Sequence, residues 1–246
     1  SLAQRYGIAV VEDNAHGLFG KFRGRCLGTF GDLATQSFHE TKNFTCGEGG
    51  ALVINNPTYA KRAEIIRQKG TNRNAFYRGE VDKYTWVDVG SSFLPSDLLA
   101  AFLLAQLEAR KQIQCKRRQI WEYYEENLKD WADASDVRLP CIPAHCEQPY
   151  HLFYLILPSA DARCELMNEL RQKGITTVFH YVPLHTSPMG LKLAGRASRC
   201  PVTESISERL VRLPFYNDMN EEEQAYVVET IRTARLRKSR PARVAV

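Results

Sequence analysis

The sequence lacks long apolar runs, and its first residues lack the features of a signal peptide. No stretch of the 246 residues approaches the ~20 apolar residues that a membrane-spanning helix needs. Residues 1–7 contain no basic region followed by an apolar core, and the chain starts with Ser rather than Met. We therefore predict a cytoplasmic protein with no membrane partner.

Paired cysteines are also missing. The chain has seven Cys, an odd number, and no two of them show the Cys-x-x-Cys spacing. A disulfide framework is not expected in a chain of this size, and the spacing does not fit a zinc site. We therefore predict reduced thiols and no bound metal.

Acidic residues are absent from the last residues of the chain, which explains the net charge of +5. Removing the six basic residues of this end from the 33 Lys and Arg leaves 27, against 28 Asp and Glu. Those six residues are Arg232, Arg235, Arg237, Lys238, Arg240 and Arg243. A basic end on a near-neutral body is typical of a solvated tail, so the charge does not predict a nucleic-acid partner.

Three short apolar runs near the N-terminus predict strands of an α/β sheet. They cover residues 8–12, 33–38 and 51–54, and the first of them reads as a buried strand. A helix should follow the turn at residues 55–57 and stop at Gly70. Ligands of such sheets bind beyond the carboxyl ends of strands, where we expect Asp13, Ser37 and the loop of Lys42.

The remaining sequence predicts a long helical region and a second, smaller α+β unit. Ser96 should cap a helix whose residues Leu99, Phe102, Leu103 and Leu107 form one buried face, with helical character continuing to Leu128 after a break. Strands are expected at residues 152–157 and 175–179, and helices at 161–173 and 220–236. The predicted domains are residues 1–115 and 116–236, followed by a basic tail at 237–246.

One cofactor fits the order of the polar residues in the first domain. Asp13 ends a predicted strand, and about 30 residues later a second strand leads into the pattern Ser37-x-x-x-x-Lys42. Pyridoxal phosphate (PLP) needs a lysine for its aldehyde and a carboxylate against its pyridine nitrogen. A glycine-rich stretch at residues 47–50 follows the lysine closely.

These motifs resemble the DegT/DnrJ-type PLP-dependent sugar aminotransferases, and the similarity runs from residue 1 to about 232. It is carried by residues 37–43, 82–86, 90–97 and 179–185. The resemblance implies the α/β architecture of fold-type I PLP-dependent transferases. We therefore expect a partial large domain with a mixed, mostly parallel sheet and a C-terminal α+β small domain.

The resemblance also implies a set of site residues. Lys42 matches the family's catalytic Schiff-base lysine, and the expected cofactor-binding residues are Lys42, Asp13, His16, Ser37 and Ser92. Many members of the family have Asn where this chain has Ser92. Substrate contacts are expected from His39, His180 and His185. Ordinary structural roles stay open as alternatives: a solvated loop lysine for Lys42, an Asx turn for Asp13, a strand-end hydroxyl for Ser37, a supporting hydrogen bond for His16 and structural roles for the other histidines.

The implied reaction moves an amino group from an amino acid, expected to be glutamate, to a nucleotide-linked 4-keto-6-deoxy sugar. The closest resemblance is to enzymes that act on dTDP-linked sugars for cell-surface polysaccharide or lipopolysaccharide O-antigen synthesis, as homodimers with shared active sites. A PLP-dependent sugar dehydratase is an alternative, although such enzymes carry His where Lys42 stands. A non-catalytic remnant of the family is another.

Chains of the family are longer at the N-terminus, where they hold opening strands of the sheet and most of the phosphate-binding groups. We therefore expect this chain to be part of a longer product and to expose a strand edge, an aggregation hazard. We also expect weak or absent turnover by the 246-residue chain alone.

Overall fold

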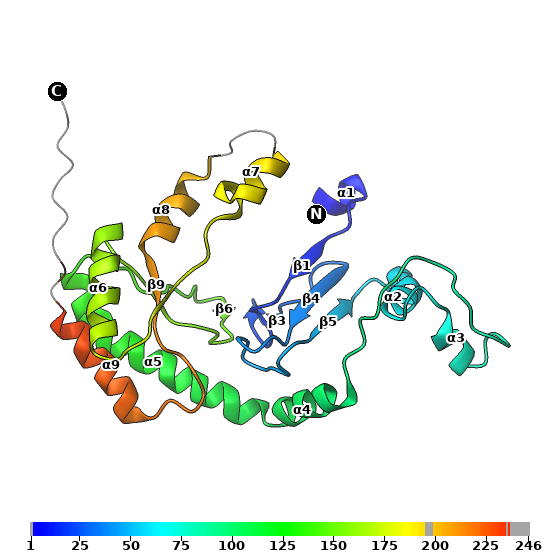
Figure 1. The fold of residues 1–246 in the computed structure, drawn as a ribbon, viewed down its shortest axis with the longest axis horizontal. Helices are drawn as coiled ribbons and strands as arrows, with labels where there is room; N and C mark the ends of the chain where they lie inside the picture. The colour runs from blue at the N-terminus through cyan, green and yellow to red at the C-terminus, as the bar shows by residue number, and fades with distance from the viewer. Residues whose placement is uncertain (1, 195–198, 235, 237–246) are drawn as a thin grey trace. The chain divides into compact units, whose positions relative to one another are not determined.

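The computed structural model describes residues 2–194, 199–234 and 236 (Figure 1). The predicted tail at 237–246 lies outside the described residues. The chain forms two compact units. The first contains Ser1–Gln114 and Ile142–His151, and the second contains Cys115–Cys141 and Leu152–Val246. The first unit is therefore discontinuous, because a segment of ten residues returns to it after α5 (Arg110–Ala134).

A mixed three-stranded sheet forms the centre of the first unit, with the order β1-β4-β5 (Figure 1). β1 (Val11–Asp13) and β4 (Leu33–Ser37) run parallel, whereas β5 (Gly50–Ile54) pairs antiparallel with β4. β4 and β5 appear where the sequence predicted them, whereas β1 covers residues 11–13 rather than 8–12. The mixed sheet with a parallel pair agrees with the predicted fold class.

The expectation that residues 8–12 are buried is wrong. Ile8 is 61% exposed and Val11 is 58% exposed. β1 lies at an edge of the three-stranded sheet, so its side chains have strand neighbours on one side only. An apolar run therefore identified the strand correctly but not its degree of burial.

A second small sheet, β3-β2-β6, was not expected. β2 (Lys21–Phe22) and β3 (Arg25–Cys26) form a hairpin, and β6 (Cys146–Glu147) pairs with β2. The hairpin turns at Arg23 and Gly24, which have φ angles of 51° and 76°. Positive φ at both central residues is the geometry that two-residue hairpins favour, and Gly adopts it without strain.

The first unit also contains helices. They are α1 (Leu2–Tyr6), η1 (Pro57–Tyr59), α2 (Ala60–Arg67), α3 (Arg73–Tyr77) and α4 (Asp97–Glu108). The predicted stop after α2 is confirmed, since Gly70 has a φ of 72° and a Cβ there would lie 1.8 Å from the Asp88 carbonyl oxygen. Ser96 caps α4, as predicted, by accepting a hydrogen bond from the Leu99 amide at 3.3 Å.

The buried face of α4 is narrower than the sequence predicted. Leu99, Leu103 and Leu107 pack against a cluster of Phe38, Phe44 and Cys46. Phe102, predicted to share this face, is 56% exposed. The three leucines form one i, i+4, i+8 row along the helix, and Phe102 lies about 100° around the helix from Leu103. The predicted break after this helix is confirmed at Ala109, where ψ is 9°.

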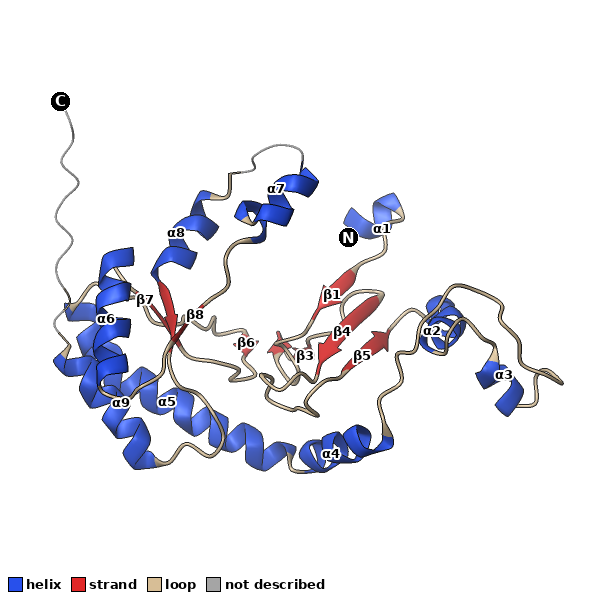
Figure 2. Ribbon diagram, viewed as in Figure 1, coloured by secondary structure: helices blue, strands red, loops and turns tan. Residues whose placement is uncertain are grey.

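The second unit packs helices against an antiparallel sheet of order β7-β9-β8 (Figure 2). Its strands are β7 (Tyr154–Ile156), β8 (Val178–Phe179) and β9 (Leu210–Arg212). The central strand β9 was not predicted. The helices are the part of α5 from residue 115 onward, η2 (Leu184–Thr186), α6 (Ala160–Gln172), α7 (Pro188–Ala194), α8 (Pro201–Arg209) and α9 (Glu221–Thr233).

The two helices predicted in this unit begin where expected. Ser159 caps α6, and Asn220 forms a capping box with Glu223 at the start of α9. α9 ends at Thr233 rather than at residue 236. Across the described part of the chain, no helix combines the length and apolar character that a membrane span requires.

Candidate active site

Asp13 and Ser37 are the last residues of two parallel strands, so both lie at the carboxyl end of these strands in the first unit's sheet. Asp13 ends β1 and pairs in register with Thr35, two residues before the end of β4. With strands ~4.8 Å apart and a rise of ~3.3 Å per residue, the backbones at Asp13 and Ser37 are roughly 8 Å apart. This carboxyl end of the strands is the place at which α/β sheets bind ligands.

A small pocket beside this end of the strands brings three of the predicted residues together. Lys42, Ser37 and His16 all line it, with Ala15, Leu18, Asn43, Phe44 and His151. Its volume is about 10 Å³, room for about one water molecule, so the pocket by itself does not enclose a cofactor.

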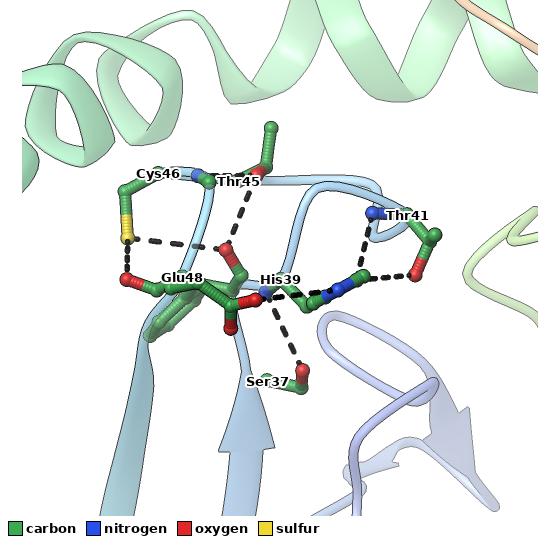
Figure 3. A network of polar contacts seen from close by, with 8 residues as sticks. Ser37, His39, Thr41, Thr45, Cys46 and Glu48 are labelled. Atoms are coloured by element: carbon green, nitrogen blue, oxygen red, sulfur yellow. Dashed lines mark hydrogen bonds and ion pairs between the residues drawn. The ribbon is translucent and has the colours of Figure 1, made fainter.

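The backbone of the loop that carries Lys42 is fixed on both sides. The Lys42 amide donates to the His39 carbonyl at 2.9 Å. The Cys46 amide and the Thr45 hydroxyl both donate to the Phe38 carbonyl, at 3.0 and 3.1 Å (Figure 3). Phe44, 1% exposed, packs edge-on against Phe19. These contacts limit where the Lys42 amine can reach.

Asp13 makes the local contact that was left open as an alternative to a ligand role. Its Oδ1 accepts a hydrogen bond from the Ala15 amide at 3.2 Å, an Asx-type turn. The side chain is exposed at the sheet edge. The turn therefore sets the direction of the carboxylate beyond the end of β1.

Glu12, to which the sequence analysis assigned no role, fixes the backbone beside Asp13. Its carboxylate accepts hydrogen bonds from the amides of Gly28, Phe30 and Gly31, at 2.9, 2.5 and 2.7 Å. Three backbone donors hold one carboxylate in a fixed place. This contact anchors β1 to the turn that precedes β4.

His39 is engaged within its own loop (Figure 3). Its Nδ1 accepts from the Thr41 amide at 3.2 Å, so Nε2 carries the proton in the neutral ring and faces the Glu48 carboxylate at 3.6 Å. The His39 amide donates to the Ser37 hydroxyl at 3.4 Å. His39 does not line the Lys42 pocket, and these contacts are those of a structural histidine.

Ser92 also lies apart from the Lys42 pocket. It is exposed, and its backbone forms an isolated β-bridge with Gln68. Nothing in the described residues of the first unit brings its hydroxyl to Lys42.

His180 and His185 belong to the second unit. His180 lines a cavity of about 480 Å³ together with Arg163 and Glu204, and its pKa is lowered by burial and by the charge of Arg212. His185 Nε2 lies 2.9 Å from Glu204 Oε1, which also accepts from the Cys200 amide at 3.0 Å. The Cys200 hydrogen bond, and then the one from His185, lower the pKa of Glu204.

Two residues of the pocket were missed from the sequence. Asn43 Nδ2 donates to the Pro149 carbonyl at 2.6 Å, and Asn43 Oδ1 lies 2.9 Å from His151 Nδ1. The His151 ring stacks on His16 with a centroid distance of 4.2 Å and a tilt of 32°. A histidine preceding a predicted strand is a weak signal, because the contact spans more than 100 residues.

The functional groups at this end of the sheet match those that PLP requires. The set contains an amine at Lys42, a hydroxyl at Ser37 and a carboxylate at Asp13, on a lysine loop and two adjacent strands. PLP uses these groups for its aldehyde, its phosphate and its pyridine nitrogen. The mixed sheet and these three groups agree with the architecture of the PLP-dependent transferases of fold-type I.

The chain belongs to the DegT/DnrJ/EryC1/StrS aminotransferase family, whose sequence pattern matches residues 1–232. Members of this family and its structural neighbours are PLP-dependent sugar aminotransferases. The family predicted from the sequence is therefore confirmed.

Individual relatives are 25% to 29% identical to this chain over the aligned residues. GDP-perosamine synthase of Escherichia coli O157:H7 is 29% identical over 234 residues, with 94% of this chain and 59% of the relative covered. The aminotransferase TlmJ from Streptoalloteichus hindustanus has a TM-score of 0.83 at 25% identity, covering 95% of this chain and 60% of its own. S. venezuelae DesV, solved with a ketimine intermediate, has a TM-score of 0.80 at 29% identity, covering 94% and 59%.

The chain spans about three fifths of the length of the curated relatives that it matches. The shared fold therefore extends over nearly the whole of this chain and over part of each relative.

Proposed function

We propose that this chain supplies the lysine, the pyridine-nitrogen carboxylate and the substrate-binding small domain of a PLP-dependent nucleotide-sugar aminotransferase. The observation that carries the proposal is the meeting of Lys42, Ser37 and His16 in one pocket beside the end of β1. The domain boundaries predicted from the sequence, at residues 1–115 and 116–236, form part of the proposal.

Each residue has a separate task. The Lys42 amine binds the cofactor aldehyde and, once released, carries a proton to and from the reacting carbon. Asp13 holds the proton on the pyridine nitrogen, and Ser37 donates to the phosphate. When bound, the cofactor supplies the electron sink that the chain's own side chains lack. Ser92, expected to reach a partner's cofactor, acts across a homodimer with shared sites.

The proposed substrates are an amino acid, expected to be glutamate, and a nucleotide-linked 4-keto-6-deoxy sugar, with dTDP as the nucleotide. GDP-perosamine synthase, a relative at 29% identity, supports a nucleotide-linked sugar as acceptor, and its nucleotide is GDP rather than dTDP. His180 is a proposed sugar contact, and His39 and His185 are weaker ones because their rings are already engaged with Thr41 and Glu204. A role in polysaccharide or O-antigen synthesis and a cytoplasmic location stay predictions.

The experiment is chemical trapping of the lysine. The chain is incubated with PLP and reduced with borohydride, and the modified peptides are mapped by mass spectrometry. We expect the pyridoxyl group on Lys42, with no comparable modification elsewhere. In Lys42→Ala the selective modification should disappear, whereas Lys61→Ala, on the exposed surface of α2, should leave it unchanged. Modification spread evenly over surface lysines, unaltered in Lys42→Ala, would count against the proposal.

A further inference from the structure

The side chain of Asn43, the neighbour of Lys42, joins two points of the returning segment Ile142–His151. Its amide group contacts the Pro149 carbonyl oxygen and the His151 ring nitrogen Nδ1. Between those two contacts lies Tyr150, whose φ of 52° is rare for a residue other than Gly. Such a backbone is strained and persists only where its surroundings fix it. Asn43 holds both neighbours of this residue.

The contacts of Asn43 determine where the proton of His151 sits. A carbonyl oxygen can only accept, so the amide atom facing Pro149 is Nδ2, the donor. The other amide atom, Oδ1, therefore faces His151 and accepts from Nδ1. In the neutral ring, Nδ1 then carries the proton and Nε2 carries the lone pair.

The same ring is stacked on His16, so His151 contacts both sides of the pocket. His16 follows the end of β1, and Asn43 follows β4. All three residues line the pocket that Lys42 lines. His151 thus links the chain after Asp13 to the chain after Ser37.

We infer that His151 is a positioning residue of the PLP site, which holds the Lys42 loop through Asn43 and orients the His16 ring by stacking. This inference deepens the proposed function and rests on it. His151 acts through its two neighbours, so we do not count it as a catalytic residue. The task requires both an aromatic ring and a proton on Nδ1, which only His provides.

A matched comparison lies six residues earlier in the same segment. His145 packs edge-on against Phe22 at 5.1 Å, and its carbonyl accepts from the Arg23 amide at 2.7 Å. It therefore belongs to the same segment and unit but does not line the Lys42 pocket. His145→Phe and His151→Phe keep a ring at each position and remove the ring nitrogens. Any difference between them reports the contact with Asn43.

The experiment measures the PLP concentration that half-labels Lys42 under borohydride trapping, together with the thermal unfolding midpoint without PLP. Losing one hydrogen bond of ordinary strength changes affinity by about three- to tenfold. We expect His151→Phe to raise the half-labelling concentration by that factor, and His145→Phe to leave it within about twofold. His151→Gln, which retains an N–H donor, should recover part of the effect.

The inference is overturned if both variants change labelling equally, or if the labelling change merely follows a loss of thermal stability. A second measurement needs no cofactor. Nitrogen NMR of the neutral His151 ring should show the proton on Nδ1, and a proton on Nε2 would contradict the assignment. If the unmodified chain shows no selective labelling of Lys42, the proposed function fails instead.

Discussion

The two units differ in how much of their apolar surface they bury. Among the described residues, only four of the buried hydrophobic side chains belong to the first unit: Ala34, Phe38, Phe44 and Cys46. The second unit buries a contiguous set that includes Tyr124, Phe153, Leu155 and Leu166, all fully enclosed. In the first unit, large side chains such as Trp86, Val89 and Leu98 are each more than three quarters exposed.

This contrast separates chemistry from stability. The first unit holds Lys42, Ser37 and Asp13, the residues with proposed cofactor roles, on a lightly packed sheet. The second unit has the packed core that stabilises a fold through burial of apolar surface. Exposed apolar area of this extent usually marks a surface that another polypeptide covers, which agrees with the proposed homodimer.

The largest expected effect is on chemistry alone. Lys42→Ala should reduce the pyridoxyl labelling of the chain after PLP and borohydride treatment to the background of surface lysines, because it removes the amine that binds the cofactor aldehyde. It should leave the far-ultraviolet circular dichroism and the unfolding midpoint within error. Lys42→Ala and Lys61→Ala are compared by mass spectrometry of the labelled peptides. A loss of labelling accompanied by unfolding would contradict the separation of chemistry from stability.

The second prediction tests where stability resides. Leu155 is 0% exposed in the second unit, and Leu155→Ala should cost about 2–5 kcal/mol of unfolding free energy. Leu98 is 84% exposed on α4, and Leu98→Ala should change the value by less than about 0.5 kcal/mol. Urea titrations followed by circular dichroism measure both. Equal losses of unfolding free energy in Leu155→Ala and Leu98→Ala would show that another surface covers α4 in solution.

Ser37→Ala tests the phosphate role within the first unit. A hydrogen bond to a charged group contributes about 1.5–3 kcal/mol, so the PLP concentration that half-labels Lys42 should rise roughly ten- to hundredfold. Thr35→Ala, two residues earlier on the same strand, is the control because Thr35 does not line the pocket. An unchanged half-labelling concentration in Ser37→Ala would leave Ser37 as a plain strand-end hydroxyl.

A smaller effect is expected at the start of α9. Asn220 and Glu223 form the capping box there, with hydrogen bonds of 2.8 and 2.9 Å. Asn220→Ala should lower the unfolding free energy by about 1 kcal/mol, because it leaves backbone donors without a partner. Denaturant titration measures the change, and Asn220→Ser should restore most of the lost stability.

The smallest effect concerns pH and His180. Burial and Arg212 lower the pKa of His180 in the folded chain, so the unfolded chain takes up its proton first as the pH falls. The stability contribution of the neutral ring is therefore fully present above the ordinary pKa of about 6.5 and is lost on acidification below it. Unfolding free energy should fall less between about pH 7 and pH 5 in His180→Gln than in the unmodified chain. Equal slopes would contradict this account.

The sequence was sufficient for features that depend on local pattern. The strands of the first sheet, the caps at Ser96 and Asn220 and the stop at Gly70 follow from periodicity and from residues suited to particular backbone angles. The pocket residues Lys42, Ser37 and His16 came together as the family motifs implied, because all three lie on two consecutive connections of one sheet.

Features that depend on contacts between residues far apart in the sequence could not be predicted from it. β6 pairs with β2 across more than 120 residues, and His151 meets Asn43 across 108. The strand β9 is only three residues long and includes the charged Arg212, so its alternation gives little signal. The predicted burial of β1 and Phe102 was wrong, because a periodic pattern gives the direction of side chains and not what covers them.

The central claim is that one cofactor bridges Lys42 and Asp13. A crystal structure of the chain grown with PLP tests it directly. We expect continuous electron density from Lys42 Nζ to the cofactor, with the Asp13 carboxylate within about 3 Å of the pyridine nitrogen. PLP bound elsewhere, or a pyridine nitrogen that Asp13 cannot reach from the end of β1, would contradict the account.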